Sequence, residues 1–296
     1  IAEAIVGLSN SIPFPIRACI GLVLAIAVTT CATNPVTGKK ELAFVAESQE
    51  ISMGRDYATP VDREMGVYPD SEVPRYVRRL GKELAVTTER PRLPWTFTVI
   101  DDPTVNAFAL PGGYIFVTRG ILGHMNSEAE LATVVGHEIG HVTARHSVQQ
   151  MTRQQLAQIG LVAGAIASDK VAQNLGVISQ GLGVLFLKYS RDDESQADGL
   201  GFRYALNDGY DVRKMIDMFQ ILQRVTASAG QRIPEWQSTH PDPGNRIQAT
   251  QARLARVTVP LDGKKVNREP FLRVLDGMVY GDNPRAGYFK GTSFLH

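Results

Sequence analysis

The stretch that decides the fold runs from residue 127 to residue 143 and reads Ser-Glu-Ala-Glu-Leu-Ala-Thr-Val-Val-Gly-His-Glu-Ile-Gly-His-Val-Thr. Ser127, followed three residues later by Glu130, is a capping box, in which two side chains satisfy the backbone N–H groups that a helix leaves free at its start. Apolar residues continue beyond this box. The pattern therefore predicts one helix from Ser127 to about Gln150.

Inside this helix His137, Glu138 and His141 form the pattern His-Glu-x-x-His. Four residues advance an α-helix by little more than one turn, so the two imidazoles project from one face. Neutral imidazoles are good ligands for Zn²⁺. Glu138 points roughly a quarter-turn away, near such a metal but poorly placed to bind it beside both histidines. That is the position of a base that takes the proton from an attacking water.

A coincidental match on a charged helix face is the alternative. Val135, Ile139 and Val142 argue against it. They make the surroundings apolar, and an unpaired polar trio in a buried stripe would cost free energy.

A catalytic zinc site needs a third protein ligand and an open position. Glu194 is the candidate, at the start of a second predicted helix, and Asp198 lies one turn further along the same face. Taken alone, the acidic run Asp192–Glu194 is commonly no more than a favourable helix N-terminus. The residues by themselves leave that alternative open.

Composition places the chain among folded globular proteins, because 44% of its 296 residues are hydrophobic and 21% are charged. These values argue against a disordered chain, a collagen-like chain and a disulfide miniprotein. The net charge of +1 gives no bulk electrostatic case for nucleic acid as a partner. Cys19 and Cys31 are the two cysteines, so neither a disulfide nor a cysteine-ligated metal site can form within the sequence that follows them.

Residues 1–31 have the layout of an export signal, with a basic residue, the uncharged run Ala18–Val28 and small residues after it. The run is too short for a comfortable bilayer span. A buried helix of the mature domain is the alternative, and nearby prolines disfavour it. Cys31 stands where a bacterial lipoprotein carries its lipidated cysteine, although Thr30 departs from that pattern and Ala25-Ile26-Ala27 offers a separate cleavage signal. We expect an exported, periplasmic protein, with Cys31 as the site of a lipid anchor.

The remaining pattern predicts an α+β fold that is mostly helical, with a small β-sheet. Helices are expected at residues 48–65, 71–87, 192–207, 211–226 and 244–257, and strands at residues 95–100 and 114–118. Residues 34–40 read as a linker, and residues after 259 as an extended tail. The apolar residues 159–187 predict a helical hairpin packed on the domain, with a gating or membrane-touching segment as the alternative. His124 and His146 lie outside the motif and are expected at the surface or at helix ends.

The motif, combined with Glu194-Ser195-Gln196-Ala197-Asp198, resembles the gluzincin metallopeptidases of peptidase family forty-eight. This family includes CAAX prenyl proteases, HtpX-like heat-shock proteases and periplasmic quality-control proteases. Residues 106–113 and the segments around His240-Pro241 and Asn245-Arg246 are similar to further segments of the family, and residues 34–42 to its bacterial lipoprotein branch. The resemblance covers residues 32–258 in the expected order.

This resemblance implies a zincin-like domain at residues 32–258 with one Zn²⁺ per chain. Its ligands would be His137, His141 and Glu194, with Glu138 as the catalytic base. Residues 259–296 would begin a further region, and we expect the natural chain to continue beyond them.

Other positions receive roles from the resemblance as well. Asp198 would orient a ligand histidine, and Arg246 would either pair with Asp198 or steady the oxyanion. His240 would reach the metal from a loop and compete with water. An edge strand would align an extended substrate by backbone pairing; it comprises Gly113, Tyr114, Ile115, Phe116 and Val117.

The implied activity is that of a zinc metalloendopeptidase on unfolded or extended polypeptides, such as misfolded or misassembled cell-envelope proteins. The alternative is a chaperone-like factor that works with the outer-membrane assembly machinery and cleaves peptides only secondarily. The apolar residues 159–187 and the anchor expected at Cys31 motivate that alternative. A purely structural zinc domain conflicts with the free base Glu138.

Overall fold

The computed structural model describes residues 31–69, 72–167, 189–228, 236, 240, 245–279, 281 and 287–289. Nearly all of the predicted export signal and most of the predicted hairpin at residues 159–187 lie outside these ranges. The described part is mostly helical with a small sheet, which confirms the predicted fold class. No helix within it combines the length and apolar character that a bilayer crossing requires.

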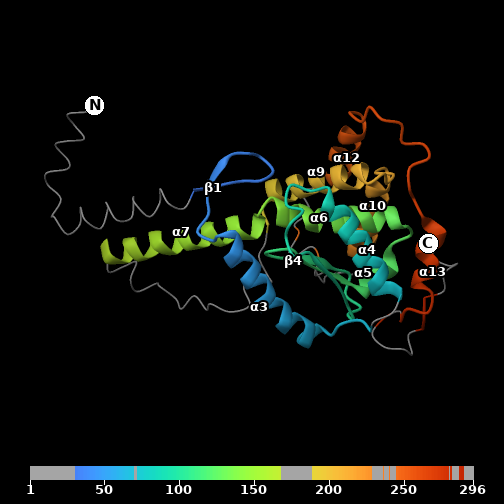
Figure 1. Cartoon of the computed structure of the whole chain (residues 1–296), viewed down its shortest axis with the longest axis horizontal. Coiled ribbons are helices and arrows are strands. Elements are labelled where there is room, and N and C mark those ends of the chain that lie inside the picture. Colours follow the sequence, from blue (N-terminus) through green and yellow to red (C-terminus); the bar gives the residue numbers. More distant parts are fainter. Residues whose placement is uncertain are drawn as a thin grey trace.

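The elements follow one another along the chain as Figure 1 shows. The helices are α3 (Glu47–Met65), α4 (Glu72–Val86), α5 (Arg119–His124), α6 (Glu128–Thr143), α7 (His146–Ala167), α9 (Arg191–Asn207), α10 (Lys214–Ser228), α12 (Arg246–Leu254) and α13 (Arg268–Leu275). The strands are β1 (Cys31–Thr33), β2 (Lys40–Leu42), β3 (Thr96–Ile100), β4 (Ala107–Leu110) and β5 (Tyr114–Thr118).

The three-stranded sheet has the order β3-β5-β4. β5 runs parallel to β3, pairing Tyr114 with Thr96, and antiparallel to β4, pairing Val117 with Ala107. The prediction that Gly113–Val117 forms an edge strand is therefore wrong, because β5 uses its backbone groups on both sides. β4 is the edge strand on that side of the described sheet, and the sequence analysis did not identify it as a strand.

Helix α6 forms the centre of the core, and all sixteen of its residues are buried. The predicted Ser127 cap is present, since its hydroxyl accepts a hydrogen bond from the Glu130 N–H at 3.3 Å. The Glu130 carboxylate accepts from the Asn126 N–H at 2.6 Å, one residue before the cap. Apolar side chains from the sheet, α4, α9, α10 and α13 surround the helix, so the motif is carried by the most enclosed element of the fold.

The predicted single helix from Ser127 to Gln150 is in fact two helices. The chain leaves α6 after Thr143, and Arg145 adopts a left-handed conformation with φ of 61° before α7 begins. Helix α7 then runs out from the other described elements (Figure 1). A non-glycine residue rarely takes this conformation without external support.

That support comes from a buried ion-pair network around Glu50 of α3. Arg145 donates from Nε to the Glu50 carboxylate at 3.1 Å and from Nη2 to the Val45 carbonyl at 2.7 Å. Arg90 donates from Nη1 to the other Glu50 oxygen at 2.8 Å and to the Val142 carbonyl at 2.9 Å. Two guanidinium groups thus pair with one buried carboxylate and fix the break between α6 and α7.

The segments at both ends of the described chain are also tied to this core. Of residues 34–40, predicted to be a linker, residues 34–39 form the turn of the β1–β2 hairpin and Lys40 begins β2, and the buried Asn34 side chain donates to the Ala144 carbonyl at 3.2 Å. The expectation of an extended tail after residue 259 is wrong at α13, where Phe271 and Leu275 are at most 1% exposed in the main core. Asn267, which caps α13, donates to the Glu128 carboxylate of α6 at 2.9 Å.

Helices α6 and α9 approach closely because glycines face each other between them. A Cβ atom added to Gly201 would lie 2.7 Å from the backbone nitrogen of His137, and one added to Gly140 would lie 3.1 Å from the Ala197 carbonyl oxygen. A distance below about 3 Å is too short for a carbon atom, so Gly201 cannot carry a side chain without moving a helix. This close approach brings the acidic start of α9 to the histidines of α6.

We expect Gly201→Ala to lower the free energy of unfolding by about 1–3 kcal/mol, the usual cost of overpacking, and to weaken zinc binding. Gly199→Ala on the same helix is the matched control, since its Cβ would meet nothing closer than the Arg253 Nε at 3.7 Å. Denaturant unfolding and zinc titration of both variants test this. Equal behaviour of the two variants would contradict the role given to the helix approach.

Candidate metal centre

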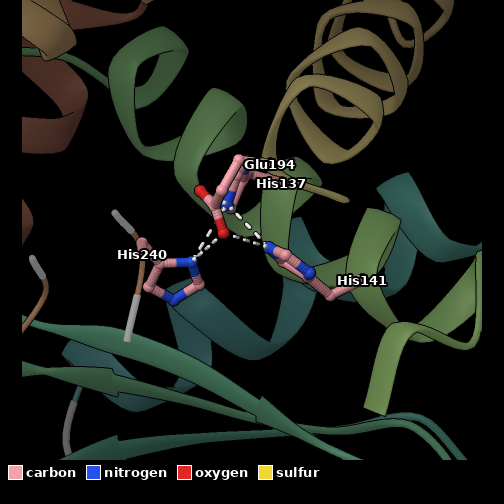
Figure 2. Close-up of side chains that lie close together, drawn as sticks. All are labelled: His137, His141, Glu194 and His240. Carbon is pink, nitrogen blue, oxygen red and sulfur yellow. Dashed lines mark hydrogen bonds and ion pairs between the residues drawn. The ribbon is translucent and has the colours of Figure 1, made fainter. Parts of the chain in front are cut away.

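Four side chains converge in the core between α6 and α9. They are His137 and His141 of α6, Glu194 of α9 and His240, and one ligand atom of each lies within 4.8 Å of the others. Figure 2 shows the three imidazoles grouped around the Glu194 carboxylate. All four are buried, and Glu194 and His141 are at most 1% exposed. The convergence that the sequence predicted for His137, His141 and Glu194 is therefore present, with His240 beside it.

Both motif histidines turn the same ring nitrogen toward the carboxylate. The Nε2 atoms of His137 and His141 are 3.0 Å apart. The Glu194 oxygens lie 3.5 Å from His137 Nε2 and 3.4 Å from His141 Nε2. Two imidazole nitrogens and one carboxylate thus face a common point, and the two Nδ1 atoms face away from it.

The start of α9 explains why Glu194 points inward. Ser190 caps the helix, and its reciprocal partner is Asp193, whose carboxylate accepts from the Ser190 N–H at 3.0 Å. Asp192 is exposed. Asp193 therefore provides the favourable negative charge at the N-terminus of α9. Glu194 does not have this role, because its side chain is directed into the core.

The electrostatics of the cluster fit a bound cation. Burial alone would raise the pKa of Glu194, but His240, His141 and His137 hold it well below its ordinary value. Burial lowers the pKa of His141, so this ring is neutral and has a lone pair to offer. Burial would also lower the pKa of His240, yet the charges of Glu194 and Glu138 raise it to about 9. The two carboxylates therefore favour a positive charge at this position, whether on a protonated His240 or on a bound cation.

A polar atom left without a hydrogen bond supports the same conclusion. Among the described residues, the Oε2 atom of Glu194 is buried and has no hydrogen-bond partner. A buried carboxylate oxygen of this kind costs free energy unless a cation or a donor satisfies it. Two neutral imidazoles and one carboxylate are the donor set of catalytic zinc sites, so the residues present fit Zn²⁺.

Asp198 contacts His137 at the ring nitrogen that faces away from Glu194. Its Oδ1 atom lies 3.0 Å from His137 Nδ1, and Arg246 donates to the same carboxylate from Nε at 2.9 Å and from Nη2 at 2.5 Å. Burial would raise the pKa of Asp198, but Arg246 and His137 lower it to about 2. An ionised Asp198 accepts a hydrogen bond from the Nδ1–H group of His137, and this leaves Nε2 without a proton and free for a metal. Of the two roles left open for Arg246, pairing with Asp198 is the one this geometry supports.

Glu138 lies at the rim of this cluster. One of its oxygens is 3.6 Å from His240 Nε2, and the other is buried without a hydrogen-bond partner among the described residues. Burial raises the pKa of the Glu138 carboxyl group, which makes it a better proton acceptor than an exposed glutamate. An adjacent pocket is lined by apolar side chains, namely Ala107, Ile121, Val134, Met218, Leu222 and Trp236.

Sequence reasoning missed two residues that contact His141. His146, expected at the surface or a helix end, does begin α7 but is fully buried, with its Nδ1 atom 2.9 Å from His141 Nδ1. Tyr189 stacks on the His141 ring with centroids 4.0 Å apart and shares a hydrogen bond with Ser147. Local residue spacing gives no signal for either contact. The left-handed turn at Arg145 creates the His146 contact, and Tyr189 is distant in sequence from His141.

The fold and this site are those of a zinc metallopeptidase. The model of peptidase family M48 matches residues 71–254, and the chain belongs to this family.

Named relatives agree with the family assignment. The chain is 31% identical to the putative beta-barrel assembly-enhancing protease of Vibrio cholerae serotype O1 over 84% of this chain and 54% of the relative. It is 30% identical to the mitochondrial metalloendopeptidase OMA1 of Arabidopsis thaliana over 76% and 44% of the two chains. The beta-barrel assembly-enhancing protease of Escherichia coli K12 is 26% identical over 79% and 50%. The chain thus spans about half the length of the curated relatives it matches.

We expect Glu194→Ala to lose zinc, because two imidazoles alone would remain. Removing a residue that only hydrogen-bonds to a metal ligand lowers metal affinity roughly 10–100-fold. Loss of the ligand Glu194 itself should lower zinc affinity by more than this. Elemental analysis after dialysis measures this, with Asp192→Ala, an exposed position in the same helical turn, as the control that keeps its zinc. Unchanged zinc in Glu194→Ala would show that another residue is the third ligand.

Proposed function

We propose that this protein is a zinc metalloendopeptidase that hydrolyses peptide bonds in unfolded or extended polypeptides, with cell-envelope proteins as its substrates. The observation that carries the proposal is the convergence of two imidazoles and a carboxylate beside a buried base, Glu138, that keeps one oxygen without a hydrogen-bond partner among the described residues. A structural zinc site has no use for such a base.

Different residues would bind the metal, transfer the proton and orient a ligand. His137, His141 and Glu194 would hold Zn²⁺, which when bound supplies Lewis acidity for the scissile carbonyl and the attacking water. Glu138 accepts the proton of that water and passes it to the leaving amine. Asp198 and Arg246 keep His137 oriented through the contacts at its Nδ1 atom.

The edge strand β4 is the best-supported place for the substrate. Its outer backbone groups have no strand partner in the described sheet, so an extended peptide could add to it by backbone hydrogen bonds. Ala107 of β4 lines the same apolar pocket as His137 and Glu138. A peptide along β4 would therefore pass the base, a role that β5 cannot fill.

Glu138→Gln should keep zinc but lower kcat by at least about 10²–10⁴-fold, the usual contribution of a general base. Its amide is nearly isosteric but cannot accept the proton. Cleavage of an unfolded protein and zinc content, measured on the same preparation, test the prediction. Full activity in the zinc-loaded variant would rule out this mechanism.

The cell-envelope role rests on the relatives and on the N-terminal sequence. Two of the relatives quoted above are named for enhancing beta-barrel assembly, and residues 1–31 have the layout of an export signal. We propose that the protein is exported to the periplasm and removes misfolded or misassembled envelope proteins, with a lipid anchor at Cys31.

The same relatives favour a second candidate, a chaperone-like assembly factor at the outer membrane for which proteolysis is secondary. The two functions differ in their need for Glu138. Rescue of a deletion strain by Glu138→Gln would favour the assembly factor, and failure to rescue would favour the protease.

We also propose that His240 holds the enzyme latent at rest. Its Nδ1 atom lies 3.0 Å from Glu194 Oε1 and 3.4 Å from His137 Nε2, so it faces the position where water and substrate must bind. The side chain is only 5% exposed. His240 would thus block the open coordination position until its side chain leaves the cluster.

His240→Ala should therefore cleave an unfolded protein several-fold faster than the wild type while retaining zinc, because the three other ligands remain. Initial rates at saturating zinc measure this effect. A variant no faster than the wild type would count against latency and leave the metallopeptidase proposal intact.

A further inference from the structure

The second motif histidine, His141, is held by a chain of neutral groups. His146 lies with its Nδ1 atom 2.9 Å from His141 Nδ1 and its Nε2 atom 2.9 Å from the side-chain oxygen of Gln196. The rings of His141 and His146 cross at 74°, so the nitrogen of one approaches the edge of the other. Both imidazoles are at most 1% exposed, so water cannot readily replace the contact between the two rings.

The positions of the protons follow from the hydrogen bonds. A contact between two neutral imidazole nitrogens needs one proton, which one ring donates and the other accepts. His141 turns Nε2 toward Glu194 and His137, and a nitrogen that binds a metal carries no proton. The His141 proton is therefore on Nδ1, where it is donated to His146. His146 then carries its own proton on Nε2 and donates it to the Gln196 carbonyl.

Two features of the fold make this chain of contacts. The left-handed turn at Arg145 starts α7 immediately and returns His146 toward His141. Helix α9 supplies Gln196 two residues after Glu194, and Asp198 two residues later. One helix thus supplies the carboxylate ligand and the final acceptor behind each ligand histidine, directly for His137 and through His146 for His141.

We propose that His146 and Gln196 are positioning residues, which hold the proton of His141 on Nδ1 and so keep its Nε2 lone pair directed at the metal. This inference rests on the proposed zinc site. The two ligand histidines then differ in character, since His137 donates to an anionic carboxylate and His141 to a neutral ring. His146 itself adds no negative charge behind the metal, and the Asp193 carboxylate lies 3.9 Å from its Nε2 atom.

Zinc affinity, measured by competition with a chelator, separates positioning from packing. His146→Leu removes the acceptor and should weaken zinc binding by roughly 10–100-fold. His146→Asn should restore most of the affinity, because its amide oxygen can accept near the position of the lost Nδ1. Val148→Ala is the control for packing: this residue is 1% exposed on the same helix, and its loss should lower stability without changing zinc affinity.

A second pair of variants changes Gln196, which is half-buried and therefore tolerates substitution better than His146. Gln196→Glu keeps an acceptor for His146 and should bind zinc like the wild type. Gln196→Met has a similar size but no comparable acceptor, and should bind zinc more weakly. The pair keeps the inference testable even if His146→Leu does not fold.

Long-range ¹H–¹⁵N spectra of the zinc-loaded chain report the protons directly. The proposal requires a proton on Nδ1 of His141 and on Nε2 of His146. A proton on Nδ1 of His146, or wild-type zinc affinity in both His146→Leu and Gln196→Met, would overturn it while the metallopeptidase proposal stands. A wild-type chain that bound no zinc would overturn both.

Discussion

The close packing of α6 on α9 is the contact on which the rest of the structure depends. Gly201 lies so near the backbone of His137 that no side chain fits between them. Because the helices approach to this degree, one turn of α9 can place Glu194 against both motif histidines and Asp198 behind one of them. The rest of the core, from the sheet to α13, encloses α6 and keeps this arrangement away from water.

Charge is distributed through this core in pairs. Asp198 is neutralised by Arg246, and Glu50 by Arg90 and Arg145, in each case through direct hydrogen bonds. Glu194 also lies near positive groups, 3.0 Å from His240 Nδ1 and 3.7 Å from Arg246 Nη1, but it and Glu138 each keep one buried oxygen without a hydrogen-bond partner among the described residues. These two oxygens lie at the metal position and at the proposed base, where chemistry needs groups that are still free to act. The pairing elsewhere holds the backbone that presents them.

The local sequence pattern predicted what depends on helical spacing. The convergence of His137 with His141 and the bounds of α3, α4 and β3 follow from periodicity and caps. The inward turn of Glu194 was predicted from the resemblance to peptidase family forty-eight, because the residues alone also allowed a simple helix N-terminus. Features set by tertiary structure were not predictable in this way. Arg145 breaks a helix whose propensities continue through it, because Glu50, nearly a hundred residues earlier, stabilises the left-handed turn. The sheet order placed β5 in the middle, and strand order is a property of pairing that a single strand does not encode.

The most direct test of the account is a crystal structure of the zinc-loaded chain with anomalous scattering at the zinc edge. The account predicts one peak at about 2.0–2.2 Å from Nε2 of His137, Nε2 of His141 and a carboxylate oxygen of Glu194. Asp198 should remain on His137 Nδ1. A peak bound without Glu194, or located away from the two histidines, would contradict the central claim that α6 and α9 together form a catalytic zinc site.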